Sequence, residues 1–201
     1  MKKVKLLSLY ASLYATLFVI APIMGDKVAS IFGVKFIAAL PVMMLAYLIV
    51  DIVNNNWGKE EARSTILNAA IIRFIIYLGV IPMVMAFTVV KQSAGFTDLI
   101  SSSFRILIAA EVSMFLGQYF IDVGIFDKIK EKMNGRFFSV RYNLSNIVSQ
   151  AFITTVFILI AKLGVIPVWP LIWGGILFRT VSSIVITPLA SGLNMLTRKL
   201  K

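Results

Sequence analysis

Charged and amide side chains interrupt the apolar segments of this chain at several positions. A charge at the centre of a bilayer costs about 2.5–3.5 kcal/mol on insertion scales, so such a residue faces a partner, a bundle interior or a water-filled route. A carboxylate there can accept hydrogen bonds from a ligand or carry a proton, and an amide can match an edge with both donors and acceptors. These residues are Asp51, Arg73, Glu111, Gln118, Asp122, Gln150 and Arg179.

The clearest spacing is that of Glu111, Gln118 and Asp122, which are seven and four residues apart. In an α-helix this spacing places the three side chains on one face. A single polar stripe on an apolar helix is what a substrate or proton pathway needs. The alternative for Asp122 is an ion pair at the end of its helix with Arg141 or Lys128.

A second polar pair, Gln150 and Thr154, has helical i, i+4 spacing, and Ser149 lies beside it. We weigh a ligand site and hydrogen bonding between helices equally here, because amides and hydroxyls often join membrane helices.

For the arginines, structural interpretations come first. Arg73 is expected to form an ion pair with Asp51 or Glu111, and Arg179 lies near the cytoplasmic end of the last helix if that helix is short.

Composition defines the class of protein. The 201 residues are 59% hydrophobic and have a mean hydropathy of +0.91, far above a soluble domain. Cysteine and histidine are absent, which excludes thiol chemistry, Cys/His zinc sites and histidine-activated nucleophiles. No acidic cluster suggests a metal, and we expect neither a cofactor nor an enzyme activity. The net charge of +11 is assigned to contacts with lipid headgroups and not to nucleic acid.

Apolar runs long enough to cross a bilayer recur along the whole chain. We therefore predict a single all-α transmembrane domain over residues 1–201, a bundle of six transmembrane helices. The predicted spans are Leu6–Met24, Phe36–Val53, Ile66–Val90, Phe104–Phe126, Leu144–Leu163 and Val165–Leu193. Segment Val165–Trp173 is alternatively an interfacial entry, because tryptophan suits the headgroup region. Asp127–Asn143 is expected to be a basic loop.

The distribution of basic residues predicts the orientation. With the N-terminus inside, 13 of the 20 Lys and Arg residues lie on the cytoplasmic side and 5 on the outer side. Positive residues favour the cytoplasmic side, so both termini are expected in the cytoplasm of a cell with this protein in its plasma (inner) membrane.

Two blocks of residues carry a family resemblance. The first block reads Asp51, Asn54, Asn55, Trp57-Gly58-Lys59 and Ala62-Arg63, with Tyr47 one turn earlier. The second reads Arg105, Gly117-Gln118, Asp122, Phe126, Arg141, Asn143, Ser145 and Ser149-Gln150. In this order the blocks resemble the queuosine precursor transporter family, also called the vitamin uptake transporter family, over roughly residues 27–164.

The chain departs from the family pattern at three places. Asn55 stands where the family usually has Glu, Glu111 stands at a usually small position, and Ile153 and Thr154 lie where an acid usually follows Ser149-Gln150. These departures concern the substrate more than the fold.

The resemblance implies import of a 7-deazapurine precursor of a modified tRNA base, such as preQ0 or preQ1. The expected substrate-binding residues are Asp51, Asn54, Glu111, Gln118, Asp122, Arg141, Asn143 and Gln150. A carboxylate would accept N–H groups from one edge of a guanine-like ligand, and an amide would match a mixed edge. An aromatic ring would stack on its face. The candidates for stacking are Tyr47, Trp57, Tyr119 and Phe120.

The energy source and partners stay open. A coupling proton is expected on Asp51, Glu111 or Asp122, or an ATPase partner supplies energy in trans, as for the substrate-binding subunits of energy-coupling-factor transporters. The chain itself carries no Walker motif. A homo-oligomer is a further expected partner state, and a membrane scaffold without transport activity is the alternative from another class.

Overall fold

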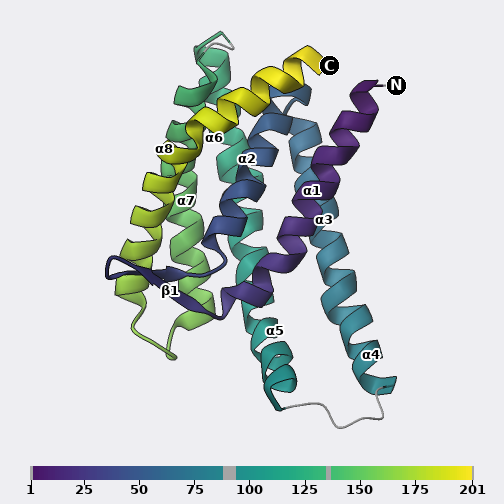
Figure 1. The fold of residues 1–201 in the computed structure, drawn as a ribbon, viewed down its shortest axis with the longest axis vertical. Coiled ribbons are helices and arrows are strands. Elements are labelled where there is room, and N and C mark those ends of the chain that lie inside the picture. Colours follow the sequence, from purple (N-terminus) through teal and green to yellow (C-terminus); the bar gives the residue numbers. More distant parts are fainter. Residues whose placement is uncertain (1, 88–93, 135–136, 201) are drawn as a thin grey trace.

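The fold is a bundle of long helices with one small hairpin at its edge (Figure 1). The computed structural model describes residues 2–87, 94–134 and 137–200. Its elements are α1 (Lys2–Gly25), β1 (Val28–Ile31), β2 (Val34–Ile37), α2 (Leu40–Trp57), α3 (Lys59–Phe74), η1 (Ile75–Val80), α4 (Ile81–Phe87), α5 (Ala94–Met114), η2 (Phe115–Asp122), α6 (Val123–Lys132), α7 (Phe138–Lys162) and α8 (Val168–Leu200).

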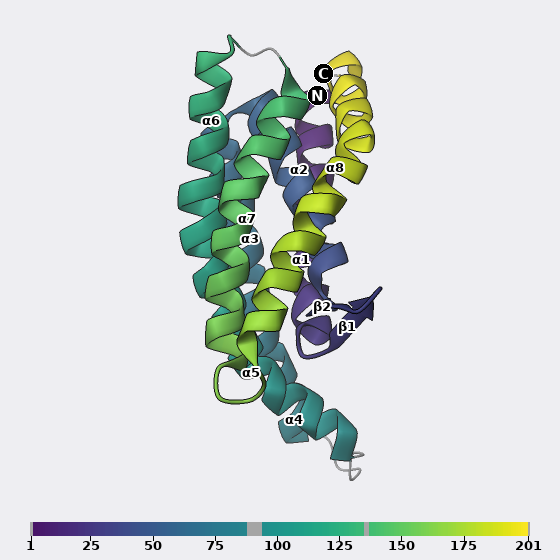
Figure 2. The same ribbon diagram turned by 90° about the vertical axis from the view of Figure 1, so that its left-hand side faces the viewer.

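Several of these helices continue one another, so the described chain forms six helical rods. The composite rods are α3–η1–α4 and α5–η2–α6, and the others are α1, α2, α7 and α8. Both ends of the chain lie at the same end of the bundle in Figures 1 and 2. This placement is what an even number of crossings requires.

Within the described residues, five stretches are long and apolar enough to cross a membrane, which confirms the predicted all-α polytopic class. They are Lys5–Gly25, Lys59–Met83, Phe104–Lys132, Phe138–Lys162 and Val168–Leu200. The remaining rod, α2, is 18 residues long and ends in polar residues. It packs against α1, α3, α6 and α8, and Ala46, Val50, Ile52 and Val53 on it are fully buried. The most enclosed helix therefore carries Asp51.

The ends of the predicted spans needed correction. The second span does not begin at Phe36, because Phe36 and Ile37 belong to β2 and α2 starts only at Leu40. The third begins at Lys59, seven residues earlier than predicted, while its predicted end at Val90 lies outside the described residues. The same holds for Lys91, Arg136 and Lys201 among the basic residues used for orientation.

The predicted loop Asp127–Asn143 is largely helical, so this prediction is wrong. Helix α6 continues to Lys132 and α7 begins at Phe138. The helical extension is stabilised by aromatic contacts, since Phe138 lies 6.1 Å from Phe126 and 6.1 Å from Tyr142 between ring centroids. Arg141 is thereby fully buried within a helix and does not lie in a basic loop.

The last helix is longer than predicted and begins abruptly. It runs from Val168 to Leu200, so Trp169 and Trp173 lie in its first turns and the separate interfacial entry is not formed. Their side chains are 68% and 69% exposed on the bundle's surface, as expected for tryptophans at a membrane interface.

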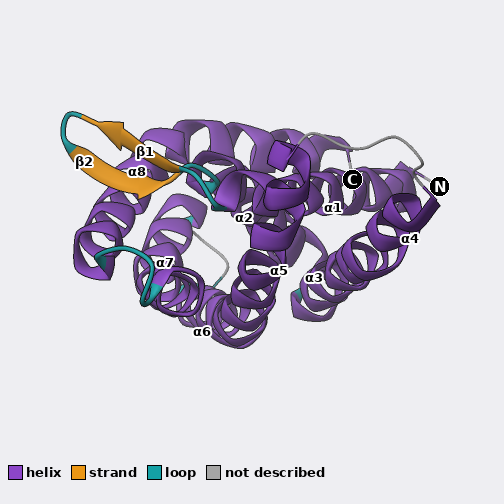
Figure 3. Cartoon of the chain, turned by 90° about the horizontal axis from the view of Figure 1, so that it is seen from below, coloured by secondary structure: helices purple, strands orange, loops and turns teal. Residues whose placement is uncertain are grey.

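The hairpin of β1 and β2 lies beside α8 at the edge of the bundle (Figure 3). Val28 pairs with Ile37 and Ile31 with Val34, around a turn in which Phe32 and Gly33 both have positive φ. Phe36 stacks on Phe178 with ring centroids 4.0 Å apart. A Cβ at Gly174 of α8 would collide with the carbonyl oxygen of Lys35, so the glycine permits this close approach.

Two segments are π-helical, and both interrupt a membrane span. In η1 the N–H of Ile81 bonds to the carbonyl of Ile76, and in η2 the N–H of Val123 bonds to that of Gln118. Such i to i+5 turns are rare and occur frequently at functional sites. The second of them carries Gln118 and Asp122.

A sharp turn at Gly58 joins α2 to α3 without a loop. Gly58 has φ 100° and ψ 174°, a conformation that is essentially restricted to glycine. The polar segment 51–63 is therefore the end of α2 and the start of α3.

We expect Gly58→Ala to lower the free energy of unfolding by about 1–3 kcal/mol, because a Cβ strains this backbone conformation. No atom lies within 4 Å of the new Cβ, so strain alone is measured. Gly124→Ala in α6 is the matched control, since its Cβ also meets open space and its φ is ordinary. Unfolding in mixed micelles checks both variants, and equal stabilities would contradict the assignment.

Candidate functional site

Buried polar side chains meet where α2, η2, α7 and α8 approach one another. Asp51 is 1% exposed, and Asp122, Gln118 and Ser149 are fully buried. Asp51 accepts a hydrogen bond from Asn146 at 3.2 Å, and Asp122 accepts one from Ser149 at 2.7 Å. Because these partners are three residues apart on α7, they place the two carboxylates beside one turn of that helix.

A chain of hydrogen bonds connects Asp51 to Arg179 across three helices. Arg179 donates from Nη1 to Oε1 of Gln150. Gln150 donates to Oδ1 of Asn146 at 3.2 Å, and Asn146 donates onward to Asp51. Arg179 is 4% exposed and lies eleven residues after the start of α8, about 17 Å along the helix axis. It therefore lies near the middle of the bundle's length and not near the C-terminal end of α8, where a shorter last helix would place it.

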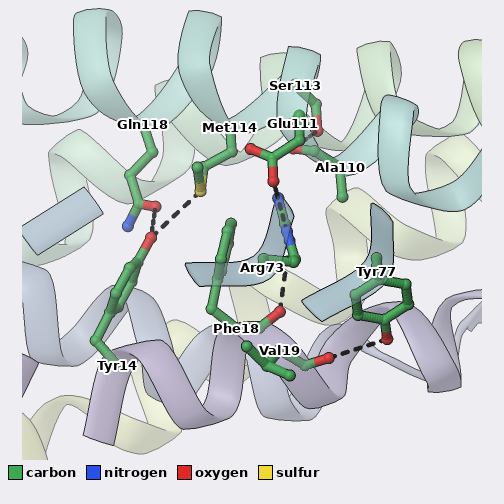
Figure 4. A network of polar contacts seen from close by, with 10 residues as sticks. All are labelled: Tyr14, Phe18, Val19, Arg73, Tyr77, Ala110, Glu111, Ser113, Met114 and Gln118. Carbon is green, nitrogen blue, oxygen red and sulfur yellow. Dashed lines mark hydrogen bonds and ion pairs between the residues drawn. The ribbon is translucent and has the colours of Figure 1, made fainter. Parts of the chain in front are cut away.

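Several buried polar atoms of the described residues in this region have no hydrogen-bond partner, among them Oδ2 of Asp122, Nε2 of Gln118 and Oδ1 of Asn54. The side-chain oxygen of Gln118, Oε1, accepts a hydrogen bond from the Tyr14 hydroxyl at 2.7 Å (Figure 4). Leaving a buried donor or acceptor unpaired costs about 1–3 kcal/mol, and more for a charged group. A free carboxylate oxygen and a free amide N–H four residues apart on η2 are therefore suited to a polar ligand.

Two asparagines at the end of α2, Asn54 and Asn55, form hydrogen bonds with other helices. Asn55 donates to Asn194 of α8 at 2.7 Å and accepts from Arg141 of α7 at 2.9 Å. Asn54 donates to the carbonyl of Val123 at 3.4 Å. Arg141 and Asn55 therefore belong to the same layer of buried polar side chains. We call this the polar layer; it also contains Asp51, Asn54, Gln118, Asp122, Asn146, Ser149 and Gln150. Asn55 occupies the position at which the family pattern has an acid.

Asn143 lies apart from this layer, between α7 and α8. It donates to Thr187 at 2.8 Å and accepts from Ser183 at 2.9 Å. The Asn143 side chain also donates to the Ser139 carbonyl, so its hydrogen bonds go to residues of α7 and α8.

Glu111 also lies apart, because the predicted stripe of three residues faces three different helices. Its carboxylate lies 2.6 Å from both Nε and Nη2 of Arg73 on α3, which confirms one of the two predicted ion pairs (Figure 4). Gln118 faces α1 and Asp122 faces α7. The hydrogen bond to Asp122 comes from Ser149, and among the described residues no ion pair joins Asp122 to Arg141 or Lys128.

A narrow cavity of about 30 Å³, within about 420 Å³ of empty space that includes its open mouth, lies between α1, α2, α3, α5, α7 and α8. Most of its walls are apolar. Its lining residues are Ala21, Pro22, Ile37, Ala39, Leu40, Met43, Tyr47, Arg73, Ile106, Ala110, Ser113, Ile153, Phe157 and Arg179.

The aromatic candidates for stacking are divided between the cavity and the periphery. Tyr47 lines the cavity, while Phe120 is 51% exposed. Tyr119 has the Arg63 guanidinium 5.0 Å from its ring centroid, and Trp57 packs edge-on against Tyr10 at 6.0 Å.

Sequence reasoning missed Asn146 and Tyr14, which pair with the predicted residues Asp51 and Gln118, and Asn194, which pairs with Asn55. For Asn146 a signal existed, because it precedes Gln150 by four residues and would share its helix face. Tyr14 and Asn194 pair across 104 and 139 residues and gave no local signal.

The whole chain was compared with known proteins. No curated protein matches it, and neither does any solved structure. A family model described as "Putative vitamin uptake transporter" matches residues 37–192, more than three quarters of the chain. The match includes Asp51, Gln118, Asp122, Gln150 and Arg179, most of the residues that line the cavity, and both π-helical segments. The chain therefore belongs to the vitamin uptake transporter family, whose members are multi-pass membrane proteins.

Proposed function

We propose that this transporter imports a 7-deazapurine precursor of a modified tRNA base, such as preQ0 or preQ1, into the cytoplasm. The observation that carries the proposal is the pair of unpartnered groups on η2, Oδ2 of Asp122 and Nε2 of Gln118. A guanine-like ring offers two N–H donors beside a carbonyl acceptor on one edge. A carboxylate oxygen can accept the two N–H donors and an amide N–H can donate to the carbonyl, so these two groups on η2 supply the complementary chemistry.

The other predicted ligand residues take supporting places in this proposal. Asn54 supplies one more free acceptor, and Gln150 links the site to Arg179. Asp51 holds Asn146, and Arg141 holds Asn55 at the end of the site nearer the chain termini. Glu111 and Asn143 act on helix packing, because Glu111 pairs with Arg73 of α3 and Asn143 with Ser183 and Thr187 of α8.

The direction of import follows from the proposed orientation in the plasma membrane. With both termini in the cytoplasm, the hairpin and the start of α2 lie on the outer side. Ile37 and Leu40 of that end line the cavity, so entry to the cavity is proposed from the outside and the polar layer is proposed to lie toward the cytoplasm. Cargo would enter near the hairpin and Leu40, then pass Arg179 to reach Gln118 and Asp122. Opening to one side at a time around a site near mid-depth is common to transporters.

We assign the driving force to a proton carried by the carboxylates of Asp51 and Asp122. Both are buried and accept hydrogen bonds from neighbouring residues of α7, and intramembrane carboxylates commonly relay protons in transporters. An ATPase partner is the competing source. A protonophore would abolish uptake in the first case, whereas reconstitution with the chain alone would give no uptake in the second.

Uptake into a strain without its own transporter tests the proposal. We expect accumulation of labelled 7-deazaguanines, with little accumulation of adenine or pyrimidines, because only a guanine-like edge matches the free acceptor and donor. Membranes containing Ser139→Ala serve as the control, since that change removes a bond between α7 and α8, to Ser191, outside the polar layer. Absence of uptake for all 7-deazapurines, with normal protein abundance, would reject this substrate class.

A further inference from the structure

The cavity contains an arginine that helix packing does not explain. Arg179 is buried and lines the cavity, and its Nε has no hydrogen-bond partner. The Nη1 group of Arg179 donates a hydrogen bond to the neutral amide of Gln150. The second arginine of the cavity, Arg73, is paired with Glu111, so the charge of Arg179 is the one that the cavity lining leaves without an acidic partner.

We propose that Arg179 is the specificity-determining residue of this cavity, which binds ligands through a neutral or anionic hydrogen-bond acceptor and rejects cations. The ligand class rests on the proposed function. The electrostatic preference does not, since it follows from the residues of the cavity.

The guanidinium is held ready for such a contact. The ring of Tyr47 lies 5.3 Å from its central carbon, and Gln150 holds Nη1. A planar guanidinium presents its N–H groups in a fixed fork that suits carboxylates and other planar acceptors. With one edge held by Gln150, the Nε–H remains for a ligand.

The surroundings strengthen the preference. Apart from Arg73, Arg179, Tyr47 and Ser113, the residues lining the cavity are apolar. Charges interact strongly where water is largely excluded, so an added cation near Arg179 is repelled and an acceptor is attracted. A ligand with an ammonium group is therefore disfavoured even where its ring fits.

The test compares three 7-deazaguanines that differ only at position 7, bound to the purified protein in detergent. The nitrile (preQ0) is a neutral acceptor, the carboxylate is anionic and the aminomethyl compound (preQ1) is cationic. We expect the nitrile and the carboxylate to bind at least about tenfold more tightly than the aminomethyl compound, which is a difference of about 1.4 kcal/mol.

The variants separate Arg179 from the rest of the protein. Arg179→Gln is expected to reduce the difference to less than about threefold. Arg179→Lys keeps the charge without the planar fork, so it should still reject the cation while losing affinity for the two acceptors. Arg198→Gln, an exposed change on the same helix, leaves the preference unaltered. If Arg179→Gln does not fold, Arg179→Lys decides alone: lower affinity for the two acceptors supports the inference, and unchanged affinity for them overturns it.

The outcomes are distinguishable from those of the proposed function. Equal or tighter binding of the aminomethyl compound by the native protein, or a difference of about tenfold or more that persists in Arg179→Gln, overturns the inference while import stands. If no 7-deazaguanine binds, the proposed substrate fails and the comparison moves to nicotinate, nicotinamide and 3-aminomethylpyridine. The same order there supports the cavity's preference, and binding of none of the six compounds overturns it.

Discussion

Glu111→Ala is expected to destabilise the folded protein by about 3–5 kcal/mol, because it leaves a buried guanidinium without its counter-charge. Arg73 has a fully buried side chain and lies 2.6 Å from Glu111. Its remaining contacts are the Phe18 carbonyl at 3.4 Å and the Phe18 ring, whose centroid lies 3.6 Å away. Neither replaces a carboxylate. Unfolding in mixed micelles measures the loss.

Two further variants interpret that loss. Glu60→Ala removes a second ion pair on the same rod as Arg73, but its carboxylate is 86% exposed and lies 3.7 Å from Arg63, so a cost below about 1 kcal/mol is expected. Combining Glu111→Leu with Arg73→Met removes both buried charges and should recover most of the stability. A Glu111→Ala variant as stable as Glu60→Ala would show that water or lipid headgroups neutralise Arg73.

Asp122→Asn is expected to lower uptake at limiting substrate at least about 100-fold. Each hydrogen bond to a charged group contributes about 1.5–3 kcal/mol, and the proposed carboxylate accepts two from the ligand. Asn keeps the volume and can still accept from Ser149, which bonds to Asp122 at 2.7 Å in the native protein. Gln118→Ala removes the neighbouring donor and should reduce uptake less, because only one neutral hydrogen bond is lost.

Abundance and binding distinguish this result from misfolding. Both variants are expected to reach the membrane in amounts similar to the native protein and to the Ser139→Ala control. Uptake that persists in Asp122→Asn would remove Asp122 from the site. A loss of abundance in both variants, with no ligand bound by the native protein, would favour a scaffold whose buried polar groups serve folding.

The class of the protein follows directly from composition, since apolar stretches of bilayer length need no tertiary information. The partner of Arg73 was narrowed to two acids because a buried cation needs one. Local pattern failed at Phe36, where apolar residues before α2 indicate a longer helix. Whether they form one depends on a pairing with Val28–Ile31 and on stacking against Phe178, and neither contact is local.

The sequence predicted which residues belong to the candidate site better than it predicted how these residues are arranged. Asp51, Gln118, Asp122 and Gln150 lie in or beside the polar layer, since each is too costly to expose to lipid. Their partners were beyond reach, because Asn146, Tyr14 and Asn194 come from other helices whose rotation no local spacing determines. The position of Arg179 near the middle of the bundle was missed for a related reason, since it depends on where α8 begins.

The π-helical segment η2 changes how the whole α5–η2–α6 rod should be compared between sequences. A turn closed over five residues advances the helical phase by less per residue than an α turn, so positions before Phe115 and after Asp122 belong to two different registers. In a continuous α-helix, residues eleven apart, such as Glu111 and Asp122, would lie on the same face. The π-helical segment between them breaks this relation. In relatives of this chain, patterns of substitution at Glu111 and Asp122 should accordingly vary independently, each following its own neighbouring helix.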